Sequence, residues 1–89
     1  MDFKKFERLY LGDRVIFMLA MELFLESGRE KILACTQQEL STNAAPGLSG
    51  FLTPGKIDVV AQTAREFAAL KTEDLLSYAA KCFGGSRKN

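Results

Sequence analysis

The chain has 89 residues, which is the length of one domain and leaves no room for a second core. Its hydrophobic fraction of 47% excludes a disordered chain. The net charge of +1 excludes a strong overall attraction to nucleic acid or to an anionic membrane surface. We therefore expect one domain over residues 1–85, followed by a flexible basic tail at 86–89.

The first predicted element is a short amphipathic helix that Gly12 closes. Its apolar residues recur at steps of three and four positions; they are Phe3, Phe6, Leu9 and Tyr10. Asp13 then fits the N-cap of a second helix that runs to about residue 27. Gly28 either ends this helix or only bends it, so a single bent helix from 13 to 40 is the alternative.

The segment 41–53 contains small residues and the helix breakers Pro46 and Gly47. It predicts a long ordered loop, with room for one short helical turn. Thr53 and Pro54 fit the N-cap and the first position of the next helix. Thr72 fits the cap of a last helix, which ends before Gly84 and Gly85.

The sequence has no stretch with the alternating pattern of a strand, so the predicted fold is all-α. We expect a small bundle of four to five short helices, with one long apolar central helix at about 13–27 and the ordered loop at 41–53. The core is expected to contain Phe17, Phe24, Ile57, Val60, Phe67, Leu75 and Phe83.

The segment VIFMLAMELFL, residues 15–25, is strongly apolar, with Glu22 as its only charge. As a helix it reaches about 16 Å, which is too short for a hydrocarbon core of about 30 Å, so we predict no membrane span. A helix that is apolar almost all round must be covered almost all round. Either it closes the core of a monomer, or its outer edge contacts another chain. The second alternative is favoured because large apolar patches are uncommon on soluble monomers.

The predicted interface lies on the outer edge of this helix and on the 41–53 loop. It comprises Val15, Met18, Leu19, Glu22, Glu26, Leu48 and Phe51. The expected partner is another protein, and a second copy of the chain in a homodimer is the first candidate.

The chain lacks histidine, which is the usual general base and the commonest metal ligand. Its two cysteines, Cys35 and Cys82, stand far apart without a CxxC motif, so we expect neither a metal site nor a cofactor. The stretch GFLTPGK, residues 50–56, has the glycine and lysine spacing of a phosphate-binding loop. However, Ile57 stands where that loop needs Ser or Thr for magnesium. These patterns predict a protein that is not an enzyme.

The predicted function is that of a small cytoplasmic, non-catalytic protein–protein interaction module: a regulator, inhibitor or adaptor. The cytoplasmic prediction follows from the charged N-terminal residues, which lack the apolar core of a signal peptide. The alternative is a small nucleic-acid-binding helical protein, like a transcriptional regulator, that uses the last two helices. Glu73 and Asp74 disfavour it, because they would place acids at the start of the recognition helix.

Overall fold

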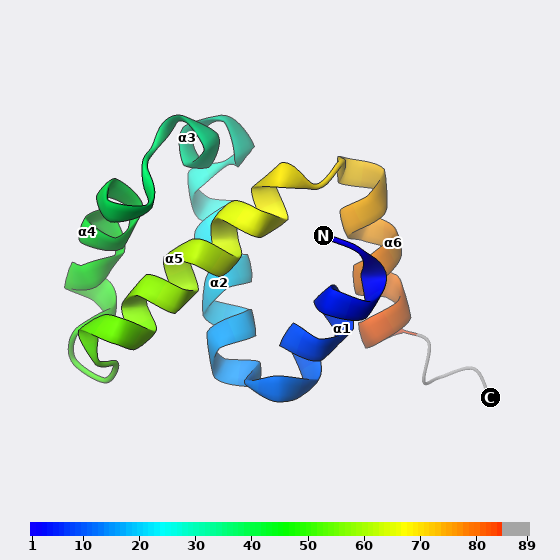
Figure 1. The fold of residues 1–89 in the computed structure, drawn as a ribbon, viewed down its shortest axis with the longest axis horizontal. Coiled ribbons are helices and arrows are strands. Elements are labelled where there is room, and N and C mark those ends of the chain that lie inside the picture. The colour runs from blue at the N-terminus through cyan, green and yellow to red at the C-terminus, as the bar shows by residue number, and fades with distance from the viewer. Residues whose placement is uncertain (85–89) are drawn as a thin grey trace.

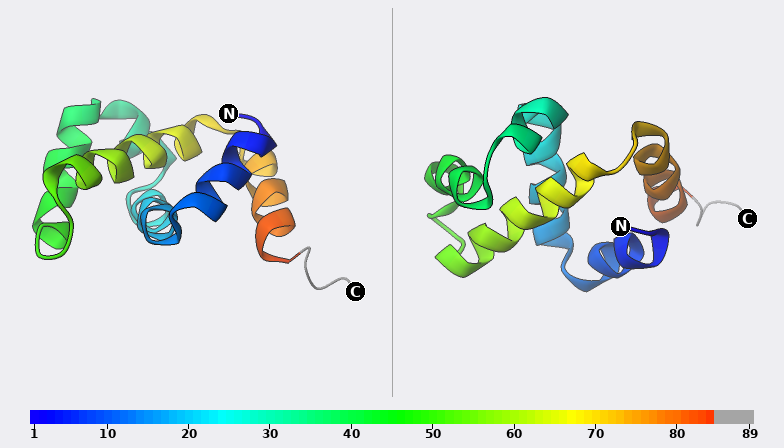
Figure 2. Two further views of the ribbon diagram at one scale, coloured as in Figure 1. Left: turned by 60° about the horizontal axis from the view of Figure 1, so that its bottom comes forward. Right: turned by 45° about the horizontal axis from the view of Figure 1, so that its top comes forward.

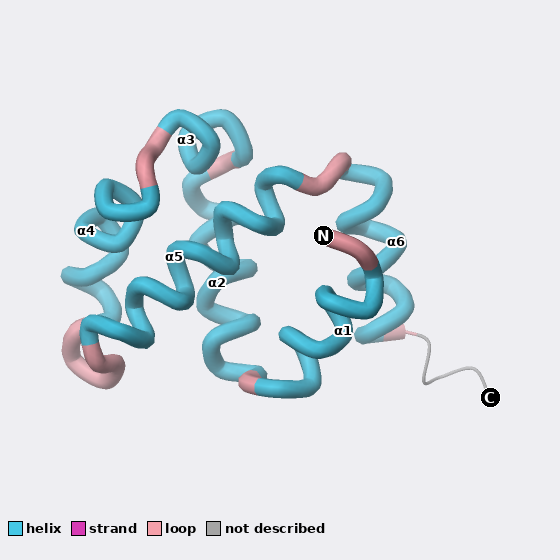
Figure 3. The backbone as a smooth tube through the Cα atoms, in the orientation of Figure 1, coloured by secondary structure: helices cyan, strands magenta, loops and turns pink. Residues whose placement is uncertain are grey.

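The computed structural model describes residues 1–84, which form six α-helices (Figures 1 and 3). The helices are α1 (Phe3–Gly12), α2 (Arg14–Ser27), α3 (Arg29–Ala34), α4 (Gln37–Leu48), α5 (Pro54–Ala69) and α6 (Thr72–Phe83). Residues 1–84 contain no strand, so the predicted all-α class is confirmed. The predicted number of helices, four to five, is too low. The expected domain end at 85 and the basic tail at 86–89 lie outside the described residues.

The helices α2 and α5 cross at the centre and share the most extensive helix–helix contact (Figure 1). The helices α3 and α4 pack against one part of α5, while α1 and α6 pair at the opposite end of the molecule (Figure 2). The centre is therefore shared between α2, with 14 residues, and α5, with 16. The prediction of one long central helix is too simple.

The core is dominated by aromatic rings from three helices. Phe6 of α1, Phe17 of α2 and Phe67 of α5 are fully buried, with ring centroids 5.2–5.5 Å apart. Six of the seven predicted core residues are buried. Phe83 is the exception at 47% exposure. It is the last residue of α6, and its ring centroid lies 5.1 Å from that of Tyr10 and 6.0 Å from that of Phe17.

Gly28 ends α2 instead of bending it. Its φ of +90° and ψ of 151° fall in a region that side chains with a Cβ rarely adopt, and α3 starts directly after it. A second break follows at Cys35, which is extended. The alternative of one bent helix from 13 to 40 is therefore wrong.

The predicted loop at 41–53 is largely helical, because α4 extends to Leu48. A capping box starts this helix: Glu39 N–H donates to Thr36 Oγ1 over 3.1 Å, and Thr36 N–H donates to Glu39 Oε1 over 2.9 Å. Packing of α4 against α5, with Leu40 buried, stabilises the helix despite Pro46 in its interior. Only residues 49–53 remain as a connection.

Polar side chains attach the outer helices to α5. The guanidinium of Arg29 donates to the carbonyl oxygens of Ala68 (2.9 Å) and Leu70 (2.7 Å) and to Thr72 Oγ1 (2.6 Å). Arg29 thereby satisfies carbonyl groups left free at the end of α5 and fixes the turn into α6. Thr72, expected as a cap, lies inside α6 and accepts this bond instead, while Lys71 occupies the N-cap position.

Candidate interaction surface

The outer face of α2 is apolar and open to solvent. Val15, Met18 and Leu25 are 56%, 53% and 70% exposed, and Glu22 lies exposed among them. We call these four residues the α2 stripe. The opposite face of the same helix, with Phe17, Ala20 and Phe24, is buried against the core. Asp13 positions the stripe by capping α2, since its carboxylate accepts the Ile16 N–H over 3.1 Å.

A groove of about 300 Å³ adjoins the stripe, between α2 and α4. Its walls are formed by Leu19, Glu22, Leu23 and Glu26 of α2 and by Asn43, Ala44, Gly47 and Leu48 of α4. Leu19 of α2 and Leu48 of α4, on opposite walls, are half-buried, and both glutamates are exposed. The structure thus brings four of the predicted interface residues to one groove.

The remaining predicted residues divide between two places. Val15 and Met18 lie on the stripe beside the groove. Phe51 is 63% exposed in the connection between α4 and α5, and it is not among the groove residues. Sequence reasoning missed Leu25, although its spacing of seven positions from Met18 would have placed it on the same face. The role of these residues in an interface stays a prediction.

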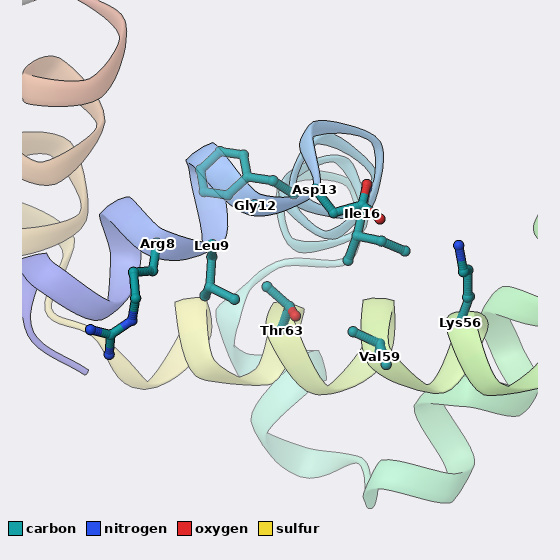
Figure 4. A pocket seen from close by; sticks show the side chains of 9 residues that line it. Arg8, Leu9, Gly12, Asp13, Ile16, Lys56, Val59 and Thr63 are labelled. Atoms are coloured by element: carbon teal, nitrogen blue, oxygen red, sulfur yellow. The ribbon is translucent and has the colours of Figure 1, made fainter.

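A second groove, of about 310 Å³, lies between the α1–α2 junction and α5 (Figure 4). Leu9, Ile16, Phe17 and Val59 form its apolar walls. Arg8 and Lys56 lie at its two ends, and the carboxylate of Asp13 is already used by the α2 cap (Figure 4). This lining suits an apolar group, but it does not bring an acid and a base together for proton transfer.

The two cysteines are free and half-buried, in different parts of the chain. Burial, with a smaller contribution from the negative charge of Glu7, raises the pKa of Cys82 above its ordinary value. A raised pKa keeps the group as a thiol at neutral pH, and the thiol is a poor nucleophile. Among residues 1–84, no three Cys, Asp or Glu side chains gather into a possible metal site.

The basic residues on the last two helices do not form one surface. Lys81 Nζ lies 4.8 Å from the centroid of the Phe3 ring, and Arg65 is half-buried in a mixed groove with Asp58 and Glu66. Glu73 and Asp74 occupy the first turn of α6. This arrangement does not favour α5 and α6 as a surface for nucleic acid.

Comparison with known proteins gives no relative: no protein-family model, curated protein sequence or solved structure matches the chain. None of the helices in the described part of the chain has both the length and the apolar character needed to cross a membrane.

Proposed function

We propose that the chain is a small cytoplasmic, non-catalytic protein–protein interaction module that self-associates through the outer face of α2. It would act as a regulator, inhibitor or adaptor. The observation that carries this proposal is the α2 stripe, in which three large apolar side chains are each more than half exposed on one helix face. Contiguous exposed apolar groups of this kind mark association surfaces on soluble proteins.

The surroundings of the stripe support the proposal. Leu19 and Leu48 extend the apolar area into the adjoining groove, where Glu26 provides a carboxylate at the edge, while Glu22 is the one charge within the stripe. Apart from Glu22, the patch has the apolar centre and charged margin that are usual for a protein interface. Removing such side chains from water favours association, because the hydrophobic effect is the main favourable contribution to most protein–protein contacts.

The cytoplasmic and non-catalytic parts of the proposal are supported by the thiols and by composition. Cys35 and Cys82 are free, as is usual in a reducing compartment. The sequence supplies no histidine for acid–base work, and the raised pKa of Cys82 makes this thiol a poor nucleophile.

The test is the molar mass in solution, measured by light scattering after size exclusion. We expect the wild type to approach twice 9.9 kDa as its concentration rises. Met18→Glu should remain at 9.9 kDa with an unchanged helical circular-dichroism spectrum. The substitution would bury an unpaired charge in the interface, which costs about 3 kcal/mol or about a 100-fold loss of affinity.

Leu76→Glu is the matched control, because Leu76 is 65% exposed on α6, away from the stripe. It introduces the same charge at a similarly exposed leucine and should leave the dimer intact. A wild type that stays at 9.9 kDa at every concentration would refute self-association. Equal weakening by both variants would show that the contact is not specific to α2.

A further inference from the structure

The last helix, α6, is attached to the fold less firmly than the two central helices. Its main helix–helix contact is with α1, whereas α2 and α5 pack extensively on each other (Figure 1). Leu75 is the buried residue of α6, while Leu76 and Phe83 are 65% and 47% exposed. The helix therefore buries little apolar surface, and releasing it costs less than opening α2 or α5.

Aromatic side chains form the contact between α6 and α1. The ring centroid of Tyr78 lies 5.5 Å from those of Phe3 and Phe6, and the ring centroid of Phe83 lies 5.1 Å from that of Tyr10. Between the described residues of these two helices there is no side-chain hydrogen bond or ion pair. Separating them therefore leaves no hydrogen-bonding group without its partner, and it uncovers an aromatic face on α1.

One polar bond ties α6 to another helix, and it lies at the start of α6. The Arg29 guanidinium donates to Thr72 Oγ1 over 2.6 Å, and among residues 1–84 no other side-chain hydrogen bond or ion pair joins α6 to a different helix. We call this bond the latch. Leu70 and Lys71, which connect α5 to α6, are extended, and Lys71 provides no side-chain cap. The connection can therefore act as a hinge, which the latch crosses.

The helix α1 has attachments of its own that do not involve α6. The ring centroid of Phe6 lies 5.2 Å from that of Phe17 in α2 and 5.5 Å from that of Phe67 in α5. Lys5 Nζ also forms an ion pair with Glu66 Oε2 of α5 over 3.1 Å. These contacts keep α1 on the central helices when α6 moves away.

We infer that α6 is a lid, which swings away from α1 about the 70–71 connection while the other five helices stay folded. Opening uncovers Phe3, Phe6 and Tyr10 on α1, and the latch sets how often the open state is reached. A helix of 12 residues is marginal in water on its own, so α6 also loses its internal hydrogen bonds in the open state. The inference uses no residue of the α2 stripe, so it stands independently of self-association.

Amide hydrogen exchange, measured by mass spectrometry of peptides and corrected for intrinsic rates, tests the lid. In the wild type, we expect the α6 amides to exchange at least about tenfold faster than the slowest amides of α5 and faster than those of α1. Ile57→Val weakens the core far from α6 and should speed exchange in α5 by about fivefold. It should leave α6 unchanged, because the core contacts of Ile57 are the same with the lid open or closed.

The latch is tested by Thr72→Val, which keeps the branched shape and removes the acceptor of the bond. This variant should speed exchange in α6 by about fivefold. Thr42→Val is the matched control, because Thr42 is exposed on α4, and it should leave exchange in α6 unchanged.

Three results would overturn the inference. If Ile57→Val speeds α6 and α5 equally, α6 opens only when the whole chain unfolds, and it is not a lid. If the α1 amides exchange at the rate of α6, the two helices leave together. If Thr72→Val and Thr42→Val have the same effect on α6, the bond from Arg29 is not a latch.

Discussion

The two faces of α2 contain similar side chains in different surroundings. The inner face presents Phe17 and Phe24 to α5 and to the aromatic residues of α1, and these side chains are buried. The outer face presents Val15, Met18 and Leu25 to solvent. The difference teaches that apolar character alone does not identify a core residue. The other helices of the chain cover only one side of α2, so similar side chains on its other side stay exposed.

The largest expected effect is on the inner face. Phe17→Ala should lower the free energy of unfolding by about 3–5 kcal/mol, because it leaves a cavity among packed rings. Met18→Ala, one position away on the outer face, should change it by less than about 0.5 kcal/mol in dilute solution. Urea denaturation followed by circular dichroism measures both. Equal losses would mean that the outer face is also core.

The stability of the fold also depends on Arg29, the first residue of α3, which follows α2. Arg29→Ala should destabilise the fold by about 2–3 kcal/mol, because it removes charge-assisted hydrogen bonds to the end of α5 and to Thr72. Arg29→Lys keeps the charge but lacks the planar fork, so it should recover only part of the loss. An unchanged denaturation midpoint for Arg29→Ala would contradict this role.

Burial of the outer face of α2 in a dimer should make the melting temperature depend on the protein concentration. Dimerisation stabilises the folded state by mass action, so the wild-type Tm should rise by a few degrees for each tenfold increase in concentration. Met18→Glu should have a Tm that does not depend on concentration. Calorimetry over a dilution series measures both, and a concentration-dependent Tm in Met18→Glu would count against the stripe.

The smallest effect concerns α4, which is attached to α5 by polar bonds as well as by packing. Ser41 Oγ (2.7 Å) and Gln37 Nε2 (3.1 Å) donate to Asp58 Oδ1, and these bonds lower the pKa of Asp58 from its ordinary value of 3.8. A lowered pKa in the fold contributes stability above the unfolded value, which is lost as the pH falls. The fall in Tm between about pH 6 and pH 3 should therefore be smaller in Asp58→Asn. Ser41→Ala removes one of the two donors to Asp58, so it should also make the fall in Tm smaller. An identical fall in Tm in the wild type and both variants would contradict the role of these hydrogen bonds.

Local signals in the sequence predicted the beginnings of helices and their inner faces. Asp13 and Thr53 cap α2 and α5 as expected, because an N-cap bond spans only three residues. The buried faces of α2 and α5 follow from apolar residues at helical spacing. The same spacing distinguishes the outer edge of α2 from its buried face, and Glu22 and Glu26 line the groove beside Leu19.

Interactions that join distant segments could not be predicted in this way. Pro46 and Gly47 predict a loop where the structure has α4, because these residues are locally unfavourable in a helix, whereas the capping box and packing on α5 stabilise it. The bonds of Arg29 cross 39 to 43 positions of the sequence, and no local pattern marks them. Phe51 lies in the connection at 49–53, which remains because α4 takes up the first part of the predicted loop, and it is not among the groove residues.

Oxidation of Met18 by hydrogen peroxide tests most directly whether the outer face of α2 is covered by a second copy. In dilute solution Met18, which is 53% exposed, should oxidise faster than the half-buried Met21. As the protein concentration rises, we expect the rate at Met18 to fall while the rate at Met1 stays constant, measured by mass spectrometry of the peptides. A Met18 rate that does not change over the range in which the molar mass doubles would contradict the proposed interface.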